Sequence, residues 1–159
     1  MDPSIAPAVR TLLKTQVIAS LGTLHDGEPY VSMVPFALLP KGPDFVIHVS
    51  SLAAHTGDML ANPKVSLLVI APGSGEVAPQ ARARITVQGE ARQVPHEAAL
   101  HPEAKESYLA RFPDSAQMFE LGDFSLFAIR PRLLRFVGGF AQARSLTAEG
   151  LAKALAEGL

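Results

Sequence analysis

The sequence contains no cysteine, and this absence removes several classes of protein at once. Without thiolates the chain cannot hold a disulfide framework, a zinc–thiolate site or an iron–sulfur cluster. Proteins that do without disulfides are typical of reducing compartments. We therefore expect a cytoplasmic protein that depends on its hydrophobic core for stability.

An excess of charge of either sign is also absent. The chain has 14 Lys and Arg residues against 15 Asp and Glu residues, which gives a formal net charge of -1. Neutralising the phosphate backbone of a nucleic acid requires a basic excess, so we expect no nucleic-acid partner. Hydrophobic residues make up 48% of the chain and charged residues 18%, which excludes a disordered protein.

Long hydrophobic runs are missing as well. The longest covers residues 65–71, is interrupted by Ser66, and is far shorter than the roughly 20 residues that span a bilayer. Residues 1–10 carry Asp2 and two prolines instead of a basic stretch and an apolar core, which argues against a signal peptide. We expect no membrane partner and a single domain over residues 1–159.

Hydrophobic periodicity predicts a mainly β protein with flanking helices. The clearest strand covers residues 81–94, where apolar and polar side chains alternate with period two. Asp26 and Gly27 form a pair typical of a hairpin turn. Residues 65–70 form a nearly continuous apolar strand, which we expect to be covered on both faces. The predicted strands are 16–24, 30–39, 44–50, 65–70, 81–94 and 124–137, the last broken near Pro131, and the predicted helices are 4–14, capped by Ser4, then 55–61, 96–112, a short one after Pro113 and a tail helix from Leu146.

These elements predict a small antiparallel barrel. Consecutive strands joined by short turns pair in antiparallel fashion, and six of them can close into a barrel. We place the barrel at about residues 15–140 and a C-terminal helix at about residues 147–157, with Thr147 as its cap. No internal repeat or linker divides the chain.

The five histidines do not form a recognisable metal pattern. His96 and His101 are five residues apart, which places them on different faces of a helix, and no HExxH motif occurs. A G-x-S-x-G elbow is absent too, which argues against a serine hydrolase. We assign no metal ligand and no catalytic residue.

Residues 50–56, Ser-Ser-Leu-Ala-Ala-His-Thr, join a strand to a helix. The first N–H groups of a helix lack partners, and together with the helix dipole they attract phosphate. An ordinary helix cap by Ser51 or Thr56 also explains the same residues, and it is the simpler interpretation. Arg82 and Arg84 on the polar face of a strand are either solvated charges or contacts to a phosphate or a ring edge. The residues alone leave both interpretations open.

Six pieces of sequence in consistent order resemble the pyridoxamine 5′-phosphate oxidase-like FMN-binding split barrel. They are GEPYVS with VPF from Gly27, HVSSLAAHTGDMLANPKVSLLV from His48, RITVQGEA from Arg84, YLARFPDS from Tyr108, FSLFAIRP from Phe124 and RFVGGFAQA from Arg135. The chain is most similar to the haem-utilisation (HugZ-like) branch, in which SSLAAHT and NPKVSLLV recur. The resemblance covers about residues 10–145.

The resemblance implies a six-stranded antiparallel split barrel that forms a homodimer with FMN at the subunit interface. It places the flavin ring along residues 30–35 and the phosphate beside residues 50–56. The cofactor-binding residues that it implies are Ser32, Met33, Val34, Ser50, Ser51, His55, Thr56, Arg84 and Gln88. Because the cofactor carries the chemistry, no acid–base side chain is required. The expected function is an FMN-dependent oxidoreductase that acts on a small-molecule substrate.

Departures from the family pattern limit this expectation. True pyridoxamine phosphate oxidases carry Glu-Phe-Trp and Arg-Leu-His-Asp-Arg segments near the last strand, where this chain has Arg-Phe-Val and then Gly-Gly-Phe-Ala-Gln-Ala over residues 135–143. Oxidation of vitamin B6 is therefore not expected. Ala54 and His55 stand in place of the family's Arg and Lys, and no histidine follows His101, so the usual haem ligand of haem-degrading relatives is absent. The alternatives are a non-enzymatic FMN- or haem-binding protein of haem utilisation and a cofactor-free structural dimer.

Overall fold

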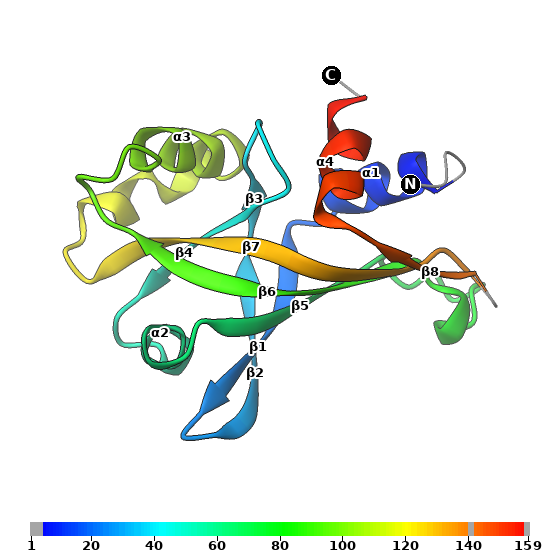
Figure 1. The fold of residues 1–159 in the computed structure, drawn as a ribbon, viewed down its shortest axis with the longest axis horizontal. Coiled ribbons are helices and arrows are strands. Elements are labelled where there is room, and N and C mark those ends of the chain that lie inside the picture. The colour runs from blue at the N-terminus through cyan, green and yellow to red at the C-terminus, as the bar shows by residue number, and fades with distance from the viewer. Residues whose placement is uncertain (1–4, 140–141, 158–159) are drawn as a thin grey trace.

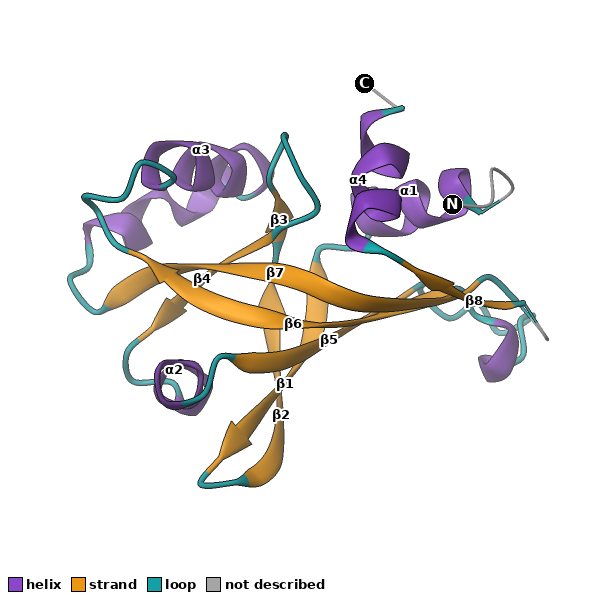
Figure 2. Cartoon of the chain, viewed as in Figure 1, coloured by secondary structure: helices purple, strands orange, loops and turns teal. Residues whose placement is uncertain are grey.

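The computed structural model describes residues 5–139 and 142–157, which form one curled antiparallel sheet with helices at its ends (Figures 1 and 2). The sheet order is β2-β1-β5-β6-β7-β4-β3, and β8 pairs with β7. The elements are α1 (Ala6–Thr15), β1 (Ile18–His25), β2 (Glu28–Pro35), β3 (Ala37–Leu38), β4 (Phe45–Ser50), α2 (Ala54–Ala61), β5 (Lys64–Ile70), the 3-10 helix η1 (Pro79–Ala81), β6 (Arg84–Val94), α3 (His101–Arg111), the 3-10 helix η2 (Pro113–Glu120), β7 (Phe124–Val137), β8 (Ala143–Leu146) and α4 (Ala148–Ala156).

The predicted fold class, a mainly β split barrel with flanking helices, is confirmed. The sheet curls until β2, at one end of the strand order, contacts β4 near the other end. The concave side holds a core that includes Leu21, Phe45, Ile47 and Ile129. Helices α1 and α4 pack on each other beside this core, whereas the β1–β2 hairpin projects away from them with α2 at its side (Figure 1).

The sheet has eight strands rather than the six predicted. The strand expected over residues 30–39 divides at Phe36, whose backbone N–H donates to the carbonyl of Val17. Strand β2 therefore pairs with β1 while β3 pairs with β4, so that the chain crosses from one edge of the sheet to the other. Strand β8 was not predicted and extends the edge of β7.

Strand β7 runs through Pro131 without the predicted break. On one of its edges β4 pairs only as far as Ile129 and β8 starts at Leu134, so Pro131 lies where neither strand needs an N–H donor. On the other edge a bulge between Gln88 and Gly89 shifts the register opposite the proline. The gap and the bulge together accommodate a proline in the middle of a sheet.

Strand β6 has the predicted alternation, since Ile85, Val87 and Ala91 are buried. Strand β5 differs from the expectation of two covered faces. Its residues Val65, Leu67 and Val69 are buried, but the other face of the strand is half-exposed. No helix in the described part of the chain lies over that outer face in Figure 1, which leaves a partly apolar sheet surface open.

The helix predicted over residues 96–112 begins only at His101, because residues 96–100 form a turn. The turn brings the rings of His96 and His101 to 4.5 Å, so the expectation that they lie on different faces of one helix is wrong.

Several other predictions for local structure agree closely. Asp26 and Gly27 form the hairpin turn, both with positive φ. Helix α1 buries the predicted apolar stripe, and Thr147 accepts a hydrogen bond from the N–H of Gly150 as the cap of α4. The predicted cap Ser4 lies outside the described residues. No helix in the described ranges is long and apolar enough to cross a membrane.

His48 on β4 is buried among aromatic rings in its uncharged form. Its ring stacks on Phe119 with centroids 3.8 Å apart and lies 5.2 Å from Phe124. Its Nδ1 atom is buried without a hydrogen-bond partner among the described residues. Burial, followed by the positive charges of His101 and Lys105, lowers the pKa of His48 from 6.5 to about 4.

The buried His48 makes stability depend on pH. The unfolded chain binds a proton at this side chain below about pH 6.5, while the folded chain does not until about pH 4. The stabilising contribution is therefore complete above pH 6.5 and is lost as the pH falls towards 4, by at most about 3 kcal/mol. Urea unfolding at pH 7.5 and 4.5 should show a smaller loss of stability in His48→Phe than in the wild type. An equal loss in both proteins would contradict the prediction.

Candidate functional site

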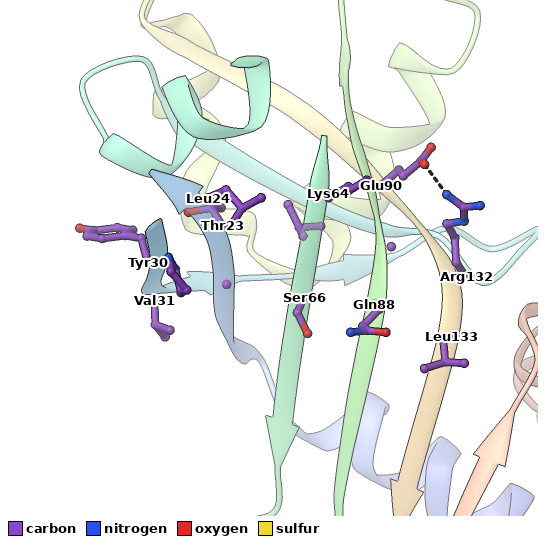
Figure 3. A pocket seen from close by; sticks show the side chains of 14 residues that line it. Thr23, Leu24, Tyr30, Val31, Lys64, Ser66, Gln88, Glu90, Arg132 and Leu133 are labelled. Atoms are coloured by element: carbon purple, nitrogen blue, oxygen red, sulfur yellow. Dashed lines mark hydrogen bonds and ion pairs between the residues drawn. The ribbon is translucent and has the colours of Figure 1, made fainter. Parts of the chain in front are cut away.

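A hollow of about 490 Å³ lies on the open outer face of the sheet (Figure 3). Strand register explains how it forms, because Val31, Gly22, Ser66, Gln88 and Leu133 are successive partners across five strands. Paired residues of antiparallel strands share a face, so all of these positions point to the same side. The residues that line the hollow are Gly22, Thr23, Leu24, Pro29, Tyr30, Val31, Lys64, Val65, Ser66, Gln88, Gly89, Glu90, Arg132 and Leu133.

The hollow is apolar along most of its floor and charged at one end. Lys64, Arg132 and Glu90 lie at this end. Arg132 Nη1 donates a hydrogen bond to Glu90 Oε1 at 2.6 Å. Glu90 is also 3.2 Å from Arg92 Nη2. Two cations and one anion thus line the rim of a mainly hydrophobic surface. A flat apolar ligand that carries carboxylates matches this arrangement.

A polar cluster links helix α2 to the β1–β2 hairpin beside the hollow. Its centre is Asp58, of which only 5% is exposed. Asp58 Oδ2 accepts a hydrogen bond from Thr23 Oγ1 at 2.7 Å, and Oδ1 lies 2.7 Å from His25 Nδ1. Burial acts to raise the pKa of Asp58, but the hydrogen bonds from Thr23 and His25 and the nearby histidine charges outweigh it and hold this pKa below its usual range. The carboxylate therefore stays charged.

The pKa of His25 is shifted in the opposite direction to that of Asp58. The hydrogen bond to Asp58, followed by the negative charge of that residue, raises the pKa of His25 above 6.5. About half of the His25 side chain is exposed, and its ring lies 5.6 Å from that of Tyr30, which lines the hollow. With Nδ1 directed at Asp58, the second ring nitrogen lies 3.9 Å from the exposed Asp26 carboxylate.

Two of the predicted site residues meet in this region. Ser32 Oγ and His55 Nδ1 are 2.9 Å apart, across the gap between β2 and α2. Burial lowers the pKa of His55 below 6.5, although the charge of Asp58 opposes this shift. His55 is therefore uncharged at neutral pH and offers little attraction to an anion.

The hydroxyls of residues 50–56 are largely committed within the chain. Ser50 Oγ donates to Asp123 Oδ2 at 2.8 Å, and Thr56 Oγ1 donates to the carbonyl of Ser50 at 2.6 Å. Ser51 is exposed, and neither it nor Thr56 caps α2, whose N-cap is Ala53. The Asp123 carboxylate beside Ser50 repels a phosphate. The contacts therefore do not fit the phosphate group of FMN, and the prediction of a cofactor site at these residues stays a prediction.

The remaining predicted residues are spread over both faces of the sheet. Met33 is exposed on the outer face, whereas the Val34 side chain is buried in the core. Gln88 lines the hollow. Arg84 Nη1 donates to the carbonyls of Gln80 and Arg82, both at 3.1 Å.

Arg84 and Ser50 lie far apart within one chain. Arg84 pairs with Val137 and Ser50 pairs with Phe124, at opposite ends of the 14-residue strand β7. At about 3.3 Å per residue, these positions are roughly 40 Å apart along the strand. A single site that uses both residues would have to draw them from two subunits.

A model of the pyridoxamine 5′-phosphate oxidase family matches residues 5–138. The chain belongs to the pyridoxamine 5′-phosphate oxidase family. Its relatives within the family place it in the predicted haem-utilisation branch. It is 38% identical to the chloroplastic heme oxygenase HOZ of Arabidopsis thaliana over 140 residues, which make up 85% of this chain and 40% of that protein. It is 27% identical to the heme oxygenase HutZ of Vibrio cholerae over 149 residues, 92% of this chain and 84% of HutZ.

A solved structure agrees with this placement. The heme binding protein of Mycobacterium smegmatis superposes with a TM-score of 0.84 at 31% identity, over 96% of this chain and 62% of that one. The chain therefore spans less than two thirds of the plant and mycobacterial relatives. All three relatives carry names that refer to haem.

The prediction of an FMN-dependent oxidoreductase is wrong. The family and its haem-utilisation branch were identified correctly, but these relatives are named for haem binding or haem oxygenation and not for flavin-dependent oxidation. The structure supplies a physical reason, since two of the three hydroxyls in the segment expected to hold the FMN phosphate, those of Ser50 and Thr56, donate to Asp123 and to the backbone of Ser50. The findings favour haem, which was the alternative cofactor.

Sequence reasoning missed the residues of the rim and of the polar cluster. His25 stands directly before the predicted Asp26–Gly27 turn and was given no role, and Asp58 lies 33 residues away from it in the sequence. One signal was available, because Asp58 immediately precedes the buried Met59 in a short helix, and a carboxylate at a core position needs a partner. Nothing in the spacing identified that partner.

The polar cluster predicts how His25 titrates. Asp58→Asn removes the negative charge that holds the His25 proton, so the pKa of His25 should fall. Asp26→Asn is the matched control, because the Asp26 carboxylate is 3.9 Å from His25 Nε2 and contributes least. NMR titration of the imidazole protons measures both changes. A larger change in Asp26→Asn than in Asp58→Asn would contradict the assignment.

Proposed function

We propose that this chain is a haem-binding protein that holds the porphyrin in the hollow on the outer face of its sheet. The observation that carries the proposal is the composition of this hollow. Its floor and sides include Leu24, Pro29, Val31 and Leu133, and its charged end presents Lys64 and Arg132. A porphyrin has the same division between a broad apolar ring and two carboxylates at one edge.

The residues fit haem better than FMN on chemical grounds. Lys64 and Arg132 can pair with propionates, and Glu90 neutralises only one of these two cations. The apolar side chains can cover the ring, while Gly22 and Gly89 leave the sheet backbone accessible. When bound, haem supplies an iron centre for binding small molecules or for electron transfer. The chain's part is to bind the ring, orient it by its carboxylates and keep water from its apolar face.

We also propose that the protein is a homodimer in which a second copy covers this face. The hollow is open to solvent, and large apolar side chains surround it. Val31 is 70% exposed, Met33 58% and Leu133 54%. Apolar exposure of this extent on one sheet face is typical of an interface, and a two-fold dimer would bring the same surface of each subunit together.

Haem degradation is a second candidate function. The two curated relatives, at 38% and 27% identity, are both named heme oxygenases. Oxygenation would need molecular oxygen and a reductant in addition to the bound haem. Loss of the haem absorption band together with the appearance of a linear tetrapyrrole, when reductant and oxygen are supplied, would distinguish this activity from storage.

Haem binding is tested by titrating the purified protein with haemin and following the Soret band. We expect a shifted band that saturates at one haem per chain. Replacing both rim cations in Lys64→Ala/Arg132→Ala should weaken binding by up to about thirtyfold, because each of the two exposed ion pairs contributes up to about 1 kcal/mol. Lys41→Ala, on the β3–β4 turn outside the hollow, is the control and should bind like the wild type. Flavin absorption bands and no Soret shift would refute the proposal.

The dimer is tested by analytical ultracentrifugation. Val31→Asp and Leu133→Asp each bring a charge onto the proposed interface and should convert the dimer to monomers without unfolding the chain, because both side chains are exposed. Leu52→Asp is the matched control, since Leu52 is 88% exposed but lies in the turn before α2. A monomeric wild type, or variants that stay dimeric, would contradict this prediction.

A further inference from the structure

We infer that the hollow binds the ring and the carboxylates of a tetrapyrrole without a bond to the iron, so that its ligand class includes iron-free porphyrin. The inference rests on the proposed haem function and goes beyond it by naming the part of the ligand that the chain recognises. It starts from the chemical types that line the hollow. These are apolar side chains, glycines, hydroxyls, one carboxamide and three charged groups.

The usual protein ligands of haem iron are largely missing from this lining. Haem proteins bind the iron through histidine nitrogen, through cysteine or methionine sulfur, or through tyrosine oxygen. The chain has no cysteine, and none of its five histidines lines the hollow. In the described part of the chain no methionine lines it either. Tyr30 is therefore the one lining residue of a ligating type.

Tyr30 leaves its strand on the face opposite to the floor of the hollow. Its partner across the β1–β2 pair is Thr23, whose hydroxyl donates to Asp58 on the side of helix α2. Paired residues share a face and successive residues alternate, so Tyr30 and Thr23 point away from the face of Val31 and Gly22. Figure 3 accordingly shows the Tyr30 hydroxyl directed away from the middle of the hollow.

The middle of the floor offers hydrogen-bonding groups instead of iron ligands. Ser66 pairs with Gly22 on one side and with Gln88 on the other, so these three positions lie between Val31 and Leu133 in the row across the sheet (Figure 3). Glycine contributes no side chain here. A neutral hydroxyl and a carboxamide suit hard cations such as magnesium, whereas iron prefers imidazole or thiolate.

The groups that favour binding lie around the edge of the hollow. Lys64 and Arg132 can pair with carboxylates at the charged end. Val31 and Leu133 are exposed in the free chain, and a flat ring placed on the floor would bury their apolar surface. Both contributions depend on the outline of the ring and on its carboxylates. Neither depends on the atom at its centre.

A second copy of the chain over this face does not alter the balance. In the proposed two-fold dimer the partner presents the same surface, and therefore the same lining without histidine. Met33 on β2 is also exposed on the outer face and carries a thioether, but it does not line the hollow.

The test compares two probes that differ only at the centre of the ring, haemin and iron-free protoporphyrin IX. Absorbance titration of haemin and fluorescence titration of protoporphyrin IX should give dissociation constants within about tenfold of each other. Lys64→Ala/Arg132→Ala should weaken both by the same factor, because the two probes carry the same carboxylates. Haemin binding that is tighter by more than this factor would overturn the inference.

Gly22→Val tests whether both probes occupy the hollow. A Cβ atom at Gly22 would lie 3.5 and 3.7 Å from its nearest neighbours, the carbonyl oxygen and Cβ of Ser66, so the variant should fold. Its side chain would fill the middle of the floor, and both probes should bind at least about tenfold more weakly. Gly75→Val is the matched control, since a Cβ there meets nothing within 4 Å and the residue lies outside the hollow. Loss of one probe alone would contradict a shared site.

A second readout examines the iron directly. The ferrous haem complex should show no iron–histidine stretch in its resonance Raman spectrum. Met33→Leu should leave the haemin spectrum unchanged, because it removes the thioether but keeps an apolar side chain of similar size. An iron–histidine band, or a changed spectrum in Met33→Leu, would overturn the inference.

The outcomes separate the inference from the proposed function. A wild type that binds neither probe would refute haem binding, and the inference with it. A wild type that binds haemin but not protoporphyrin IX would leave haem binding intact and overturn the inference. Similar affinity for both probes, lost together in Gly22→Val, would support both.

Discussion

A single buried carboxylate, that of Asp58, holds helix α2 against the β1–β2 hairpin. Asp58 lies on helix α2, and burying its charge is tolerable only because Thr23 and His25 donate to both of its oxygens. These two residues belong to β1, so the requirement for partners fixes the helix against the hairpin. The position of the hairpin in turn places Tyr30 and Val31 at the edge of the hollow. The shape of one edge of the hollow on the outer face therefore depends on an electrostatic requirement on the core side of the sheet.

Local chemistry was sufficient to predict much of the fold. The Asp-Gly turn, the alternation along β6 and the stripe of α1 each depend on a few neighbouring residues, and each was predicted from sequence. The errors arose where distant segments decide the outcome. The division at Phe36 depends on a bond to Val17, and the continuity of β7 at Pro131 depends on where β4 and β8 end. Neither partner can be identified from the sequence around the residue.

The candidate site shows the same division. Resemblance correctly identified the family. Two of the residues that it implied, Ser32 and His55, lie within hydrogen-bond distance of each other, but their role stays a prediction. It could not reveal how the hydroxyls of Ser50 and Thr56 are used, because their acceptors, Asp123 and the backbone of Ser50, are determined by tertiary packing. A motif records which residue types are present. It does not record whether their hydrogen-bonding capacity is free for a ligand, and this distinguishes an FMN phosphate site from a closed structural turn.

The walls of the hollow come from five stretches of the chain, residues 22–24, 29–31, 64–66, 88–90 and 132–133. No two consecutive elements can form it alone, so the surface exists only once β1, β2, β5, β6 and β7 have assembled. Such non-local contacts make folding slow relative to helical proteins of similar size. A ligand that recognises this surface binds the native chain and not its folding intermediates, and it stabilises the native state in proportion to the logarithm of its free concentration. Ligand supply would then govern how long the chain survives proteolysis as well as what it does.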